Sequence, residues 1–264
     1  MPSEESGMNW KAATARLTTF TNEPVPIEAA AEWWAAVVGS DPESEQAQRP
    51  LQQAQFQGRL GDLPLGLRLL PGRVDWYLGD FPSGQGVVIA AGGPVEWGLI
   101  GDLDAASNAI ATVAKQWLPL GPSISRIAYG SLQVFEVPSR AEGYRVLDGF
   151  LDSVTIDADG TTDFLLQLNR RRPSGVVKGL ELNRLIKWFV LLMRDRGVLS
   201  ISPQGVGVVA PEEPEADDSH YVGLELDLNT APEYQSTFDP ESALAVWAEL
   251  LSLGRDIADN GDRA

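Results

Sequence analysis

No cysteine occurs among the 264 residues, and histidine occurs once, at His220. The lack of cysteine excludes disulfides, thiolate nucleophiles and Cys-ligated zinc or iron–sulfur sites, and a single histidine cannot build a multi-histidine metal centre. No apolar run approaches the roughly 20 residues that span a bilayer, and the N-terminal residues lack the basic and apolar regions of a signal peptide. We therefore expect a cytoplasmic protein without a metal, another cofactor or a membrane contact.

Basic residues are also scarce, since 20 Lys and Arg stand against 37 Asp and Glu, a net charge of −17. A surface of this charge repels nucleic acid and steers the protein toward basic partners. The hydrophobic content of 44% is that of a globular chain, which excludes a collagen-like or fully disordered protein.

One short segment departs from the acidic average. Residues 170–196 carry eight basic side chains against Glu181 and Asp195. Such a segment is typical of a contact with an anion or a nucleic acid, or of a complement to acidic surface within the chain or on a partner. The binding candidates that it supplies are Arg170, Arg171, Arg172, Arg184, Lys187 and Arg194.

Hydrophobic periodicity predicts strands at 12–20, 124–137, 161–168 and 221–228, and short strands between 51 and 98. Helices are expected at 27–38, from Asp102 or Asp104 to Trp117, from Ser139 to about Leu151 and from Pro240 to about Leu253. The stretch 40–50 has the composition of a loop, and the tail after Gly254 is expected to fray. This order predicts an α+β fold, a twisted and largely antiparallel sheet with four or five helices packed on it. Two α/β halves, 1–155 and 156–264, are an alternative to one continuous domain.

The segment 179–196 has the best amphipathic pattern in the chain. Read as a helix, it places Leu182, Ile186 and Phe189 on an apolar face and Arg184, Lys187 and Arg194 on the opposite face, where the charges would form a basic ridge. A long buried strand is the alternative, because Leu191 falls on the basic side.

Three groups of residues are candidates for chemistry. His220 could serve a catalytic triad, but it follows a loop rich in Pro and Glu, and an exposed loop histidine is the simpler interpretation. The segment Asp157–Asp163 lacks the later Glu of a calcium loop and is read as a turn. A carboxylate-dependent hydrolase would use a pair from Asp75, Asp80, Asp102 and Asp104, although spacing alone cannot bring two of them together.

Tryptophan is abundant, with eight residues. Most fall on apolar stripes and are expected in the core. Trp33 and Trp188 lie at the edges of their stripes, where they could either complete the core or anchor a partner.

Three segments together resemble a known family: 74–81 in the hairpin region, 124–130 as a mid-chain strand, and 224–228 followed by a C-terminal helix. The chain resembles a sporadically distributed bacterial family of cytoplasmic proteins of about 250 residues and unknown function. That family tends to show an Arg-Tyr-Asn type strand where this chain has Arg126, Tyr129 and Gly130. The resemblance implies an accessory role, such as immunity or defence, and supplies no catalytic residues.

The sequence therefore predicts a non-enzymatic protein-binding or regulatory protein, which acts through an acidic surface and a local basic ridge. The partner is expected to be a protein, and a basic partner would suit the acidic surface. The alternatives are the carboxylate-dependent hydrolase and a contact with an anion or nucleic acid through 170–196, the one place where nucleic acid is expected to bind.

Overall fold

The computed structural model describes residues 8–79, 98–193, 200–202, 205–207 and 219–263. Four α-helices occur in this part of the chain: α1 (Ala29–Val38), α2 (Leu103–Trp117), α3 (Arg140–Phe150) and α4 (Pro240–Asn260). The longer strands are β1 (Lys11–Phe20), β3 (Gln53–Leu60), β4 (Leu63–Leu70), β5 (Arg73–Leu78), β7 (Arg126–Val137), β10 (Glu181–Met193) and β13 (Ser219–Thr230). The shorter strands are β2 (Ser44–Gln48), β6 (Gly101–Asp102), β8 (Leu165–Asn169), β9 (Arg172–Pro173), β11 (Ser200–Ser202) and β12 (Gly205–Gly207).

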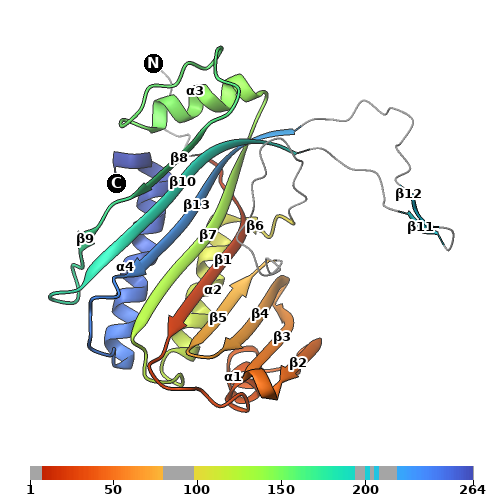
Figure 1. Cartoon of the computed structure of the whole chain (residues 1–264), viewed down its shortest axis with the longest axis vertical. Coiled ribbons are helices and arrows are strands. Elements are labelled where there is room, and N and C mark those ends of the chain that lie inside the picture. Colours follow the sequence, from red (N-terminus) through yellow and green to blue (C-terminus); the bar gives the residue numbers. More distant parts are fainter. Residues whose placement is uncertain (1–7, 80–97, 194–199, 203–204, 208–218, 264) are drawn as a thin grey trace.

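One large sheet organises the molecule (Figure 1). It has eleven strands in the order β2-β3-β4-β5-β1-β7-β13-β10-β8, with β6 beside β1 and β9 beside β10, while β11 and β12 form a separate hairpin. All pairings between these strands are antiparallel. The predicted α+β class with a largely antiparallel sheet is confirmed, and the sheet is larger than the sequence indicated.

When β2, β6, β9, β11 and β12 are left out, the order strand, helix, three strands, helix occurs twice among the described elements. The first group contains β1, α1, β3, β4, β5 and α2, and the second contains β7, α3, β8, β10, β13 and α4. Within the sheet the first group runs β3-β4-β5-β1 and the second runs β7-β13-β10-β8, so the two groups follow the opposite order on either side of the β1–β7 pair. The first group ends with α2 at Trp117 and the second begins with β7 at Arg126, and the halves 1–155 and 156–264 stay a prediction.

The four described helices all pack on one face of the sheet. Trp34 of α1 stacks on Trp76 of β5, and Trp117 of α2 contacts the same ring. In the second group Trp247 of α4 meets Tyr129 of β7 edge to face. The helices α2 and α4 also contact each other at the centre of this layer, and none of the described helices is long and apolar enough to cross a membrane.

Local capping explains where the helices begin. The side chains of Asp102, Ser139 and Asp239 each accept a backbone N–H from the first turn of α2, α3 and α4. Helix α1 ends at Gly39, whose φ of 75° is favourable only for residues without a β-carbon. These starts and the stop after α1 were all expected from the sequence.

The prediction of a helix over 179–196 is wrong, because Glu181–Met193 forms strand β10; residues 194–196 lie outside the described residues. Leu182, Ile186 and Trp188 point toward the helices, while Asn183 and Phe189 point to the opposite face, and all five are buried. A strand that is buried on both faces carries apolar residues without clean alternation, so its sequence also fits a helical stripe. The long buried strand that was left as the alternative is the observed structure.

Two smaller expectations also fail. The stretch 40–50 contains the edge strand β2, whose exposed polar residues gave no alternating apolar signal. The C-terminal tail does not fray: α4 continues to Asn260, and Asp262 is buried. Its carboxylate accepts the backbone N–H groups of Asp152 and Ser153 at 2.7 and 3.1 Å, which ties the tail to the loop after α3.

Candidate functional site

The basic residues of the 170–196 segment are divided between two faces of the sheet. Arg184 points into the helix layer and is 9% exposed, whereas Lys187 points to the opposite face and pairs with Glu225 at 2.9 Å. Since the segment is a strand, these side chains form no common ridge. Arg194 lies outside the described residues.

Most of the other basic side chains of the 170–196 segment lie near acidic groups of the same chain. Arg170 lies 3.5 Å from the buried carboxylate of Asp262 and donates to its backbone carbonyl at 2.7 Å, and Arg171 pairs with Glu233 at 3.0 Å. Burial lowers the pKa of Arg184, the nearby Arg172 and Arg170 lower it further, and Asp256 acts in the opposite direction. This geometry favours an intramolecular complement to acidic surface over a free anion-binding ridge.

Trp33 and Trp188 do not anchor an interface in this structure. Trp33 is 7% exposed and packs edge to face on Trp117, and Trp188 is fully buried against Trp10 and Phe150. Both complete the core between the sheet and the helices. Trp188 was expected at the edge of an apolar helical stripe, and this position is wrong because the segment is not a helix.

The candidate carboxylates have separate roles. Asp75 is buried on the sheet, Asp80 lies outside the described residues, and Asp102 caps α2. Asp102 and Asp104 do line one cavity of about 420 Å³, but Asp104 lies 3.8 Å from Arg255 and Asp102 is engaged by backbone N–H groups. His220 is half-buried on β13, and the described residues contain no cluster of three or more acidic or histidine side chains placed to hold a metal ion.

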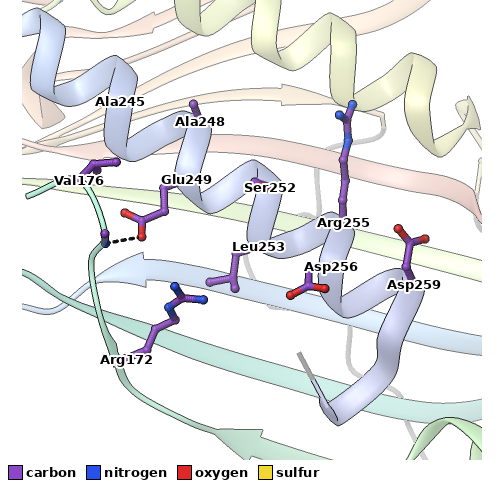
Figure 2. Close-up of a pocket in the computed structure, with 11 residues that line it drawn as sticks. Arg172, Val176, Ala245, Ala248, Glu249, Ser252, Leu253, Arg255, Asp256 and Asp259 are labelled. Carbon is purple, nitrogen blue, oxygen red and sulfur yellow. Dashed lines mark hydrogen bonds between the residues drawn. The ribbon is translucent and has the colours of Figure 1, made fainter.

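A larger open groove, of about 810 Å³, follows the outer side of α4 (Figure 2). Arg172 and Val176 form one wall, and Glu249, Asp256 and Asp259 project from α4 on the other. Glu249 accepts the backbone N–H of Gly175 at 2.7 Å and the hydroxyl of Ser174 at 2.5 Å, so it holds the wall in place. The groove is acidic overall and follows the charge of the whole chain.

The face of the sheet opposite the helices has a different character. Side chains alternate along each strand, so that Leu17, Trp76 and Tyr129 enter the helix layer and their neighbours point to the other side. We call the centre of that other side the arginine face. It consists of Arg68 on β4, Arg73 on β5, Arg16 on β1 and Arg126 on β7, four adjacent strands.

Two carboxylates of the described strands lie among these arginines. Asp75 is 1% exposed, accepts the hydroxyl of Thr18 at 2.5 Å and lies 2.9 Å from Nε of Arg73. Asp227 on β13 borders the face, and the side-chain amide of Asn229 donates to it at 3.0 Å. The arginine face is therefore a basic area on a strongly acidic molecule.

Ring contacts orient two of the arginines. The guanidinium groups of Arg73 and Arg126 lie 5.7 and 5.0 Å from the ring centre of Phe20, one from each neighbouring strand. Arg126 also donates to the side chain of Asn229 and to the carbonyl of Thr230, each at 3.2 Å. These contacts fix the orientation of the two guanidinium groups on the face.

Glycines keep this face flat. The ring of Tyr77 lies over Gly66, where an added β-carbon would be only 2.0 Å from Cζ, and the guanidinium of Arg16 lies over Gly130. Nε of Arg16 is buried without a hydrogen-bond partner in the described structure. Burial raises the pKa of Tyr77, while hydrogen bonds with Gln57 and Gln55 and the charge of Arg68 oppose the rise. Tyr77 is therefore a neutral hydrogen-bonding group beside the arginines.

The arginine face was not predicted from the sequence. Its arginines lie at positions 16, 68, 73 and 126, inside segments whose summed charge is negative, and only the strand register brings them together. Because Arg68 and Arg16 alternate with buried leucines, the sequence indicates that both arginines point away from the core. It could not show which strands are neighbours.

Comparison of the chain with protein-family models, with curated proteins and with solved structures finds no match. The resemblance to a sporadically distributed bacterial family stays a prediction.

Proposed function

We propose that this protein is a non-enzymatic binding protein that holds an acidic segment of a partner protein on the arginine face. The observation that carries the proposal is the gathering of four half-buried arginines from four adjacent strands on the side of the sheet opposite the described helices. Arginine is the residue best suited to bind carboxylates, because its planar group donates two parallel hydrogen bonds.

The charge of the whole chain supports a short acidic segment over a nucleic acid. A nucleic acid extends beyond the arginine face, and its phosphates would meet the surface of a molecule with a net charge of −17. A few carboxylates of a peptide can bind within the basic area alone. The acidic surroundings then orient the partner, because other approaches are repelled.

Fluorescence anisotropy with defined probes tests this proposal. The probes are a labelled peptide of alternating Glu and Tyr, a Lys and Tyr peptide of equal length, and a single-stranded oligo-dT. We expect the acidic peptide to bind in a buffer of about 20 mM salt and to weaken at about 200 mM, because exposed charges are screened. Preference for oligo-dT would favour the nucleic-acid alternative and contradict the proposal.

Variants locate the binding. Arg16→Gln combined with Arg68→Gln should weaken the acidic peptide roughly tenfold or more, since a hydrogen bond to a charged group is worth about 1.5–3 kcal/mol. The control, Arg140→Gln with Arg145→Gln on α3, removes the same net charge from the helix side of the molecule. Equal losses in both double variants would mean that only the overall charge matters.

A second pair of variants leaves the arginines intact. Gln57→Glu adds a negative charge beside Tyr77 at an exposed position of the face, and Gln116→Glu adds one on the exposed side of α2. The first should weaken the acidic peptide and the second should not.

A basic partner on the acidic surface is the second candidate, and the groove along α4 favours it. Asp256 and Asp259 line this groove together with Arg172 and Arg255. The Lys and Tyr peptide is the corresponding probe. Its binding should be lost in Asp256→Asn with Asp259→Asn if the groove is the site.

A further inference from the structure

The two ends of the sheet differ in how they are protected. An edge strand offers unpaired backbone groups to any other strand, and proteins block this with charges, prolines or bulges. The edge strand β2 contains Glu45, and Arg49 and Pro50 follow it directly. The edge strand at the other end, β8, pairs in the described structure only with β10.

Within its own five residues, strand β8 has none of these protective features. Its five residues, Leu-Leu-Gln-Leu-Asn, include no charge and no proline. Leu165 is 61% exposed, one of the most exposed large apolar side chains in the described chain. Charged residues begin directly beyond its end, at Arg170, Arg171 and Arg172, and pairing with β10 is interrupted before Pro173 of β9.

The charges on either side of β8 are arranged so that two antiparallel copies of the segment would place opposite charges next to each other. Asp163 and Arg171 are both exposed, and each lies four residues from Gln167 at the centre of the strand. In an antiparallel pair of two such segments centred on Gln167, Asp163 of each copy is opposite Arg171 of the other. Arg171 already pairs with Glu233 at 3.0 Å, and its five N–H donors allow a second carboxylate.

We infer that two copies of this chain pair antiparallel through β8 and join their sheets into one. The contact is isologous, as a twofold dimer requires, because the same strand serves on both sides. The molecule already joins its two groups by an antiparallel pair of strands, β1 with β7. A strand from a different protein has no reason to match both flanking charges, whereas a second copy matches them by symmetry. This inference is independent of the arginine face.

Sedimentation equilibrium over a wide range of concentration tests the dimer. We expect a reversible monomer–dimer equilibrium for the wild type. Leu165→Lys should weaken the dimer at least tenfold, because it replaces an exposed apolar side chain at the joined edge with a charge, which is how natural edge strands prevent pairing. A wild type that stays monomeric up to about 1 mM, where even weak pairing is populated, would overturn the inference.

Charge exchange then tests the register. Asp163→Arg alone and Arg171→Asp alone should each weaken the dimer about ten- to thirtyfold, since two opposite-charge pairs become two like-charge pairs. The double variant should restore the dimer to within about threefold of wild type, because opposite charges then face each other again at both positions. Arg145→Asp on α3 is the control and should leave the dimer unchanged. A double variant as weak as the singles, or a dimer that is indifferent to all these changes, would overturn the β8 pairing.

Discussion

Replacing Gly66 by alanine tests how the arginine face is built. An alanine β-carbon at this position would lie 2.0 Å from Cζ of Tyr77, 2.3 Å from its hydroxyl oxygen and 2.5 Å from Cε1. Ordinary contacts are 3.4 Å or longer, so the ring has to move by more than 1 Å, although Tyr77 is only 4% exposed. Overpacking of this kind costs about 1–3 kcal/mol.

Part of that cost is offset in the unfolded state. Alanine restricts the unfolded chain more than glycine does, which is worth about 0.4–1 kcal/mol in favour of folding. Gly66→Ala should therefore lower the free energy of unfolding by about 1–2 kcal/mol, and the thermal midpoint by a few degrees. Urea denaturation followed by tryptophan fluorescence measures this change.

The double-mutant cycle with Tyr77→Ala decides the cause. If the ring of Tyr77 is what an added β-carbon meets, Gly66→Ala becomes neutral or slightly stabilising once the ring is gone. Gly149→Ala in α3 is the matched control, because nothing lies within 4 Å of its added β-carbon, and it should stabilise by about 0.5–1 kcal/mol. The reasoning is refuted if Gly66→Ala is equally destabilising with and without Tyr77.

Two further predictions concern carboxylates away from the face. Burial alone would raise the pKa of Asp262, but hydrogen bonds from Ser153 and Asp152 and the charge of Arg170 outweigh it and hold the pKa below its usual 3.8. Its stabilisation is therefore complete above that value and is lost as the pH falls through the lower pKa of the folded state. Asp262→Asn should cost about 1.5–3 kcal/mol at neutral pH and clearly less near pH 3, as urea denaturation at the two pH values would show. Asp239→Ala, which removes the cap on α4, should cost about 1 kcal/mol in thermal denaturation, and Asp239→Asn much less.

Local signals were the part of the fold that the sequence predicted well. The caps at Asp102, Ser139 and Asp239 depend on atoms within three residues, so the sequence alone indicates where α2, α3 and α4 begin. The same holds for the stop at Gly39. The class of fold followed from the order of these elements.

Strand β10 shows where local patterns fail. Its residues are apolar on both faces of the sheet. Leu182 and Trp188 are buried under the helix layer, and Phe189 is buried on the opposite face. That environment comes from strands and helices far away in the chain, so periodicity could not separate a strand from a helix here.

The candidate site was missed for a related reason. Summed charge drew attention to 170–196, where Arg170 and Arg171 turn out to pair with Asp262 and Glu233. The arginines that gather in space are isolated along the chain. These arginines lie side by side because β1 pairs with β5 and with β7, and this pairing cannot be predicted from the sequence of any one segment.

Photo-crosslinking tests most directly whether the arginine face binds an acidic segment. A photoreactive p-benzoylphenylalanine replaces Gln57, which is exposed on this face beside Tyr77, or Glu32, which is exposed on the helix side in α1. After irradiation with the labelled Glu and Tyr peptide, we predict an adduct from position 57, reduced by high salt, and none from position 32. An adduct from position 32 alone, or equal adducts from both positions, would contradict the account.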